Sequence, residues 1–474
     1  MPDIDSGRII RLSTYAHFFE REDVIAVIHS LTSVPVFISP KLKSVLTQLE
    51  TGLSYSDATK HSTNYTHEEA VELVNRLAEA NMVVPMEYSE QDYLDLIRSK
   101  VFRGPRFNIL FMLLTEACNL HCPYCFIEGS KPKKYRNCMM TTETARQAVQ
   151  MFGKHQSRTD GDPKSIVFYG GEPLLNQDAL FTALDQIDGL SSAGVLPARV
   201  DRILITNGTL LTPTLAKSLA ERNVFPYVSI DGPPEIHNRQ RPFHNGRGSF
   251  DRAVRGLELV RSVGMEPGIS VTVTEEMIDD LPQTLEWLIT NIGVKSVGFN
   301  MLESIPGRDY FSESYGDRFA NALLKCQEIC DKYEVYEERV MRKVKQFAKQ
   351  EVYVYDCAAC GEQLTIAPDG QIGVCQGFVG TREFYSGFVS DPNYDPNADP
   401  VFIDWSNVSP LNNDKCLSCS ALGLCGGGCP RNPYILGKGI GGIDTRYCTH
   451  TLKTQEWIVF QLYDKIQDDK GGGR

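Results

Sequence analysis

The chain has 474 residues, of which 42% are hydrophobic and 23% charged, a balance typical of a globular protein with about three domains. Its 48 basic and 60 acidic residues give a net charge of -12, which argues against nucleic acid or an anionic membrane as partner. We find neither an apolar run near the ~20 residues of a membrane span nor a secretory signal pattern, and therefore expect a cytoplasmic protein.

Residues 1–100 contain no cysteine and are expected to form a separate module. β-branched runs at 23–29 and 34–38 predict short strands. An amphipathic helix begins at Ser39 and Pro40, and a capping-box sequence from Thr66 to Glu69 begins a second helix before a strand at 82–85. This order predicts a winged-helix-like α+β domain.

From Arg106 to about Gly298 strand-like and helical stretches alternate. Helices are predicted at 142–152, 212–222 and 250–264. The predicted strands are 107–114, 165–169, 202–206, 226–230, 269–274 and 296–300. Six βα repeats indicate an α/β fold with a parallel sheet curved into a partial (β/α)6 TIM-like barrel, whose active site lies at the carboxyl ends of the strands.

Eleven of the fourteen cysteines are clustered, which in a cytosolic protein favours metal binding or redox chemistry over disulfides. Residues 340–450 are rich in glycine and cysteine and lack a regular period, so we expect bound metal to hold them. The predicted domains are therefore 1–100, a barrel over 101–335 and a cysteine-rich domain over 336–474.

Cys118, Cys122 and Cys125 follow the first predicted barrel strand. Three thiolates on one tight loop can ligate three irons of a [4Fe–4S] cluster and leave the fourth iron open for an exogenous ligand. Zinc is an alternative, although it usually takes a fourth protein ligand nearby.

This C-x3-C-x2-C spacing, with the aromatic Tyr124 before the last cysteine, resembles the radical SAM (S-adenosylmethionine) enzymes. The resemblance implies that the Gly-Gly-Glu-Pro turn holds the methionyl amino group with Glu172 as acceptor. It also implies that Ser229 and Asp231 contact the ribose and that Arg241 binds the SAM carboxylate. The full implied SAM-binding set is Tyr124, Gly170, Gly171, Glu172, Pro173, Asn207, Ser229, Asp231 and Arg241.

The later cysteines resemble the seven-cysteine SPASM extension, with Cys357 as an eighth thiol. The resemblance implies two fully ligated [4Fe–4S] clusters, hence three clusters in all together with SAM. It assigns the nearer cluster to Cys357, Cys360, Cys375 and Cys429, and the farther one to Cys416, Cys419, Cys425 and Cys448. Paired zinc ribbons are the alternative for these eight residues.

Three cysteines remain. Cys326 and Cys330 share a helix face with apolar residues and are predicted to pack in a core. Cys138 lies in the loop after the cluster motif and is a candidate hydrogen-atom donor.

The strand and helix order of residues 1–100 resembles PqqD-like recognition domains, which bind the leader of a ribosomally made precursor peptide as an added strand. An unrelated winged-helix module or a structural cap is the alternative.

Together these features predict a radical SAM/SPASM oxidoreductase that matures a precursor peptide, with flavodoxin or ferredoxin as electron donor. The expected reaction is an oxidative C–C, ether or thioether cross-link. Alternatives are a peptide epimerase, a small-molecule dehydrogenase and a sulfatase-type formylglycine maturase, against which Gln376 counts because such relatives carry an aspartate there. A non-enzymatic iron–sulfur relay or sensor is the alternative from another class.

Overall fold

The computed structural model describes residues 7–158, 163–308 and 311–471. The first residues of the chain, on which the expectation of no secretory signal partly rests, lie outside the described residues. No helix in the described ranges is long and apolar enough to cross a membrane.

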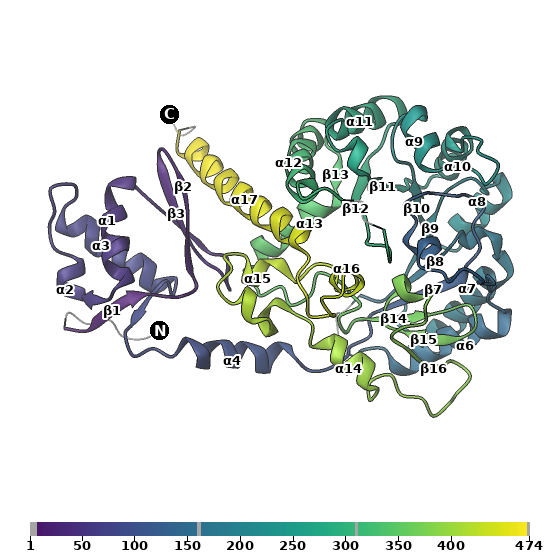
Figure 1. Ribbon diagram of the computed structural model, residues 1–474, viewed down its shortest axis with the longest axis horizontal. Helices are drawn as coiled ribbons and strands as arrows, with labels where there is room; N and C mark the ends of the chain where they lie inside the picture. The colour runs from purple at the N-terminus through teal and green to yellow at the C-terminus, as the bar shows by residue number, and fades with distance from the viewer. Residues whose placement is uncertain (1–6, 159–162, 309–310, 472–474) are drawn as a thin grey trace.

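Most of the chain surrounds one large sheet, which Figure 1 shows bent into an open arc with helices on its outside. Six parallel strands follow one another in sequence order, as predicted. They are β7 (Ile109–Thr115), β8 (Ser165–Gly170), β9 (Asp201–Thr206), β10 (Val224–Ser229), β11 (Gly268–Val273) and β12 (Ser296–Met301). Their bounds agree with the predicted ones to within two residues.

Helices connect these six strands, and two more follow the last of them. They are α5 (Phe126–Gly129), α6 (Thr142–His155), α7 (Gln177–Ser192), α8 (Pro213–Glu221), α9 (Pro234–Gln240), α10 (Phe250–Ser262), α11 (Leu281–Trp287), α12 (Tyr315–Tyr333) and α13 (Glu338–Lys349). Cys326 and Cys330 are fully buried on α12 within a hydrophobic core, which confirms their predicted packing role.

The sheet continues beyond the six predicted strands. β13 (Tyr336–Glu337) pairs in parallel with β12, and β14 (Gln363–Ile366) pairs in parallel with β7. Two antiparallel strands, β15 (Gln371–Gly373) and β16 (Tyr385–Phe388), bring this sheet to ten strands in the described part of the chain. The cysteine-rich segment is therefore held in part by backbone pairing to the main sheet, and our expectation of bound metal alone was incomplete.

The rest of this segment consists of loops and helices. The helices are α14 (Pro400–Ser406), α15 (Leu422–Cys425), α16 (Arg431–Ile435) and the long α17 (Thr445–Gly471).

Residues 7–88 form two small sheets and three α-helices. β1 (Ile9–Leu12) lies between β5 (Leu53–Ser54) and β6 (Val83–Pro85), while β2 (Ala16–Arg21), β3 (Val24–His29) and β4 (Pro35–Ile38) form an antiparallel meander. The helices are α1 (Lys43–Glu50), α2 (Tyr55–Ala58) and α3 (His67–Glu79), and the capping box of α3 is present as predicted. β1, β2 and β5 were not predicted from the sequence.

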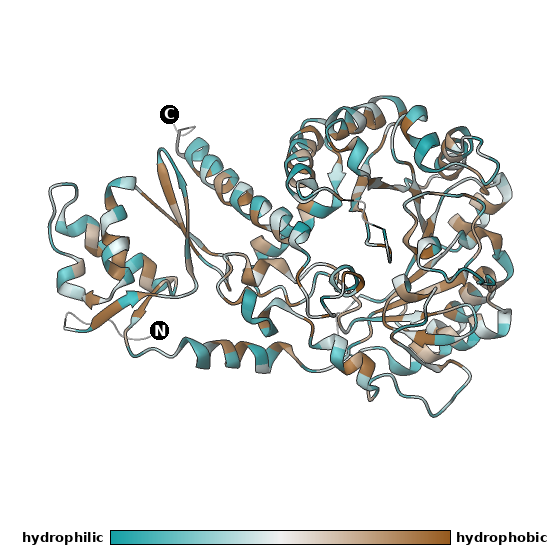
Figure 2. Cartoon of the chain, viewed as in Figure 1, coloured by the Kyte–Doolittle hydropathy of each residue, from teal (hydrophilic) through white to brown (hydrophobic). Residues whose placement is uncertain are grey.

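This module is docked on the C-terminal helix. Ala26 and Ile28 of β3 share a core with Ile458 and Val459 of α17, and Figure 1 shows α17 beside β2 and β3. Figure 2 shows the hydrophobic residues that run along these strands. α4 (Glu90–Val101) then leads from the module to the main sheet.

Candidate functional site

The predicted motif residues meet at one edge of the main sheet. Cys118 follows β7, the Gly-Gly-Glu-Pro turn ends β8, Asn207 follows β9 and Asp231 follows β10. Since neighbouring parallel strands end at the same edge, four distant segments of the chain are brought together there.

Three thiols lie on the loop between β7 and α5. Burial raises the pKa of Cys118 and of Cys122 to about 12, and the Cys122 thiol also feels the charges of Cys125 and Cys118. The backbone N–H of Leu120 donates to the Cys118 sulfur at 3.4 Å. The loop therefore brings three half-buried thiols close enough together to influence one another.

This donor set fits an iron–sulfur cluster better than a single ion. Within the described ranges, no three His, Cys, Asp or Glu side chains lie close enough together to hold a single metal ion. A [4Fe–4S] cluster binds each thiolate at a separate iron and is tuned by N–H donors to its sulfurs. Cys118, Cys122 and Cys125 would hold such a cluster, whose irons would also keep these half-buried thiols deprotonated.

The Gly-Gly-Glu-Pro turn fixes the start of the cysteine loop. The N–H of Gly171 donates to the Thr115 carbonyl at 2.8 Å, and that of Glu172 donates to the Ala117 carbonyl at 2.9 Å. A Cβ atom at residue 171 would lie 2.2 Å from the Ala117 oxygen. Glycine is therefore required there for the backbone approach, while Pro173 begins the short helix that follows.

The Glu172 carboxylate joins two of the strand-end turns. It is fully buried and accepts hydrogen bonds from the Thr206 hydroxyl at 2.7 Å and the Asn207 N–H at 2.8 Å. Burial raises its pKa to about 7, although these hydrogen bonds oppose the rise. A methionyl amino group would have to share these oxygens, so the implied acceptor role of Glu172 stays a prediction.

Asn207 ties the turn after β9 to the cysteine loop. Its side-chain amide donates to the side-chain oxygen Oδ1 of Asn119 at 2.9 Å and lies 3.9 Å from the Cys118 sulfur. The Asn119 amide in turn donates to the Thr209 hydroxyl at 2.8 Å.

Asp231 is the anchor of a buried charged group. Its carboxylate is fully buried and accepts two hydrogen bonds from the Arg241 guanidinium, at 2.8 and 3.0 Å. It also accepts from the Tyr124 hydroxyl at 2.6 Å and from the Thr272 N–H at 2.9 Å. These four bonds fill the carboxylate, so a ribose would have to share its oxygens. Ser229, the other implied ribose contact, is buried at the end of β10.

His237 supports this group and was not singled out from the sequence. The Asp231 N–H donates to its Nδ1 at 3.3 Å, and its Nε2 lies 3.0 Å from the Ser249 oxygen. Because the Ser249 hydroxyl donates to the Arg241 carbonyl, Nε2 must carry the proton and the ring is neutral. Burial lowers the pKa of His237 to about 4.

The later cysteines gather in two sets. Burial raises the pKa of Cys429 well above its usual range, and the charges of Glu303, Cys357 and Cys375 add to this. The adjacent Cys360 thiol, together with burial, raises the pKa of Cys357. We call Cys357, Cys360, Cys375 and Cys429 the near set.

The far set consists of Cys416, Cys419, Cys425 and Cys448. Burial raises the pKa of Cys448 to about 12, and the charges of the other three thiols contribute. N–H groups point at one sulfur of each set: Gly377 donates to Cys375 at 3.3 Å and Gly427 to Cys425 at 3.4 Å. The structure thus groups the eight thiols in the same crossed order that the resemblance implied, although cluster binding by either set stays a prediction.

Cys138 lies beside a different group of charges. Burial raises the pKa of its thiol, the charges of Glu116 and Asp369 raise it further, and the charge of Arg382 opposes the rise. Its backbone N–H donates to the Glu116 carboxylate at 2.8 Å. Cys138 therefore lies near Asp369 and Arg382 of the cysteine-rich segment. Its role as hydrogen-atom donor stays a hypothesis.

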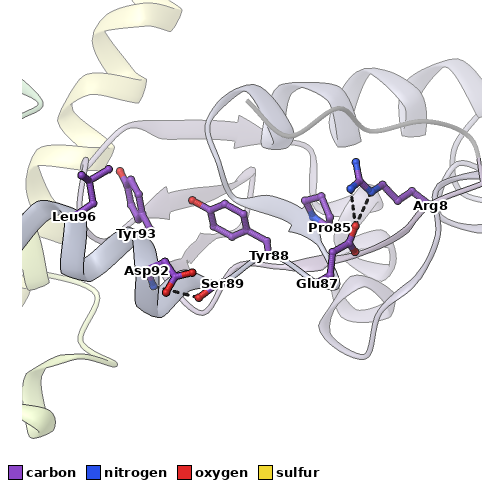
Figure 3. A pocket seen from close by; sticks show the side chains of 8 residues that line it. All are labelled: Arg8, Pro85, Glu87, Tyr88, Ser89, Asp92, Tyr93 and Leu96. Carbon is purple, nitrogen blue, oxygen red and sulfur yellow. Dashed lines mark hydrogen bonds and ion pairs between the residues drawn. The ribbon is translucent and has the colours of Figure 1, made fainter.

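An open hollow of about 500 Å³ lies elsewhere, where β6 meets α4 (Figure 3). Pro85, Tyr88, Tyr93 and Leu96 give it apolar walls, and an ion pair of Arg8 with Glu87 at 2.6 Å closes one end. None of the motif residues lines this hollow, so we place the chemistry at the sheet edge.

Comparison with known proteins agrees with this geometry. Residues 112–288 match the model of the Radical SAM superfamily, so the chain contains a radical SAM domain. Radical SAM cyclopropyl synthase TigE of Paramaledivibacter caminithermalis is 22% identical over 470 residues, which cover 93% of this chain and 92% of that protein. The serine-type anaerobic sulfatase-maturating enzyme of Klebsiella aerogenes is 24% identical over 70% of this chain and 82% of its own.

Two solved structures share the fold. The anSMEcpe enzyme with bound AdoMet has a TM-score of 0.62 at 19% identity and covers 76% of this chain and 99% of its own. Streptococcus suis SuiB bound to S-adenosylmethionine has a TM-score of 0.54 at 16% identity and covers 92% of this chain and 99% of its own. These relatives include a radical SAM enzyme and a sulfatase-maturating enzyme, and proteins of this superfamily bind a [4Fe–4S] cluster and SAM.

Proposed function

We propose that this protein is a peptide maturase that uses its radical SAM domain to form an oxidative cross-link in a ribosomally made precursor peptide. The observation that carries the proposal is the joining of the cysteine loop, the Glu172 turn and the Asp231–Arg241 pair at one sheet edge. Cys118, Cys122 and Cys125 would hold a [4Fe–4S] cluster, which in its reduced state would supply the one electron needed to cleave SAM to methionine and a 5′-deoxyadenosyl radical.

The residues of the chain position SAM for that cleavage. Asp231 holds the Arg241 guanidinium rigidly, so that its remaining N–H groups can receive a carboxylate. Tyr124, bonded to the same Asp231 carboxylate, fixes the cysteine loop relative to Arg241. Burial of these groups excludes water, which protects a reactive radical from side reactions.

The near and far sets support an oxidative outcome. Their eight thiols would hold two fully ligated clusters, whose chemistry is one-electron transfer. After hydrogen abstraction, closing a new bond on the peptide releases one electron and one proton. Epimerisation releases neither, so a chain equipped to accept electrons favours cross-linking.

The assignment of a peptide as the substrate rests on the N-terminal module. β2 and β4 are the edge strands of their three-stranded sheet, and an extended leader can pair with such an edge through its main chain. SuiB has been solved with its precursor peptide SuiA and covers 92% of this chain. TigE, which matches almost the whole chain, is named a cyclopropyl synthase, so we favour a carbon–carbon bond.

A formylglycine-forming activity is disfavoured by the residue after Cys375. Gln376 accepts a hydrogen bond from the Gln363 side-chain amide at 2.9 Å. A neutral amide held in this way cannot take the proton that an aspartate would take.

The test is the exact mass of the product. The anaerobically reconstituted protein is incubated in deuterated water with SAM, a ferredoxin or flavodoxin reductant, and a short peptide encoded beside its gene. Loss of two hydrogens, absent with the C118A/C122A/C125A variant, would support a cross-link. Gain of one carbon-bound deuterium would show epimerisation instead, and an unchanged peptide with SAM still cleaved would refute the peptide substrate. No SAM cleavage would favour the relay or sensor.

A further inference from the structure

Arg431 is a buried cation between the cysteine loop and the near set. It lies two residues after Cys429, and its side chain is 2% exposed. Its guanidinium donates to the Gly377 carbonyl at 3.0 Å, the Ser304 carbonyl at 2.7 Å and the Ser130 hydroxyl at 2.8 Å. These contacts join three segments that are far apart in sequence.

The residues that Arg431 touches adjoin the thiols. Gly377 follows Cys375 by two residues, and Phe126, whose ring lies 5.3 Å from the guanidinium, directly follows Cys125. A Cβ atom at residue 377 would lie 2.3 Å from the Arg431 side chain, so a glycine there makes room for it. The ring of Phe378 lies on the guanidinium as well, at 5.7 Å.

The charge of Arg431 has no hydrogen-bonded carboxylate among the described residues. Its three bonds go to neutral oxygens, and the Glu303 carboxylate lies at 4.0 Å. Glu303 is itself a partner of the Cys429 thiol at 3.5 Å. A buried cation is costly unless an anion compensates it.

Other buried cations of the cysteine-rich segment are compensated. Arg446, two residues before Cys448, makes two hydrogen bonds to the Asp444 carboxylate at 2.6 and 2.8 Å. Lys343, which donates to the Cys425 carbonyl, pairs with the Asp356 carboxylate at 3.0 Å. The two cations beside the far set thus make hydrogen bonds to carboxylates, whereas Arg431, beside the near set, meets its nearest carboxylate, Glu303, only at 4.0 Å.

We propose that Arg431 is the counter-ion of an anionic iron–sulfur cluster in the near set and raises its reduction potential. This inference rests on the proposed function, which assigns a cluster to these four thiols. A fixed positive charge stabilises the cluster with one added electron more than the cluster without it, and net charge is one of the determinants of cluster potential. Arg431 is a positioning and tuning residue, since it touches no substrate.

The test measures a potential, not turnover. The full chain carrying C118A/C122A/C125A is reconstituted anaerobically, so that the remaining signals belong to the near and far sets, and it is titrated with dithionite under electron paramagnetic resonance. The near signal is the one that C375A removes. R431M removes the charge at similar length, while R431K keeps the charge and loses the planar fork.

We expect R431M to lower the midpoint potential of the near cluster, R431K to keep it close to that of the parent, and the far cluster to stay unchanged. Equal potentials in R431M and the parent would overturn the inference, as would equal shifts in R431M and R431K.

If R431M does not retain the near cluster, R431Q is measured in its place. If R431K retains the near cluster and neither R431M nor R431Q does, the result supports Arg431 as the counter-ion. If all three variants lose the near cluster, the inference is overturned. A parent with no near cluster would refute the cluster assignment itself.

Discussion

The guanidinium of Arg382 donates to the carboxylate of Glu116 at 2.8 Å, so a residue of the cysteine-rich segment holds a residue two positions before Cys118. The Glu116 side chain is fully buried, and it also accepts from the Tyr135 hydroxyl at 2.6 Å. The pair links the loop of the radical SAM domain to the segment that carries the near and far sets.

This pair predicts a loss of stability when one partner is removed. R382M leaves the Glu116 carboxylate buried without its cation, and we expect the free energy of unfolding to fall by about 3 kcal/mol. Chemical denaturation of the anaerobic protein measures it. E116Q/R382M, which removes both charges, should recover part of the loss. If the loss of unfolding free energy in E116Q/R382M equals the sum of the losses in E116Q and in R382M, the pairing is contradicted.

The Asp231–Arg241 pair predicts weaker SAM binding when it is broken. D231N removes the charge that orients Arg241, so we expect the dissociation constant of SAM to rise at least tenfold, or about 1.4 kcal/mol. Equilibrium dialysis of the reconstituted protein measures it. Y124F, which leaves both bonds from Arg241 to Asp231 in place, is the matched control and should change the constant less.

Iron content should be unchanged in both of these variants. A D231N protein that binds SAM as tightly as the natural one would show that the pair is not part of the SAM site.

His237 predicts a pH dependence of stability. Its pKa falls to about 4 in the folded protein from an ordinary 6.5, so the unfolded chain binds a proton first as the pH decreases. The contribution of the neutral ring is complete above pH 6.5 and is lost as the pH falls toward 4, by up to about 3 kcal/mol. A proton on Nδ1 would also prevent this nitrogen from accepting the hydrogen bond of the Asp231 N–H.

Denaturation of the natural protein and of H237Q between pH 4 and 8 isolates this effect. The difference in unfolding free energy between the two should shrink as the pH falls below 6.5. A constant difference would show that His237 is not held neutral.

The two thiol sets predict a pattern of iron loss. Reconstituted natural protein should carry about twelve irons, and the triple variant C118A/C122A/C125A about eight. C360A should diminish the same spectroscopic signal as C429A, although 69 positions separate them, and C416A the same signal as C448A. Pairing of C429A with C416A instead would refute the crossed order. The measurement is iron and sulfide analysis with electron paramagnetic resonance of each variant.

The sequence by itself determined the local parts of this protein. The alternating βα pattern predicted all six central strands because burial on both faces of a parallel sheet demands apolar runs that are visible in the chain. The cysteine spacing and the Gly-Gly-Glu-Pro turn were readable because a short loop places its own residues close together. The capping box at Thr66 and the packing of Cys326 and Cys330 follow from the same local rules.

Tertiary structure alone decided the contacts between distant segments. Pairing of β14 with β7, docking of the N-terminal module on α17 and the bond of Arg382 to Glu116 leave no periodic trace, because each depends on two segments separated by more than 200 residues. The sequence offered Asp231 and Glu172 as ligand contacts, but folding satisfies both carboxylates with protein donors, since buried charges must be hydrogen-bonded. The position of Arg431 among the thiols likewise emerged only when β12, α5 and α16 came together.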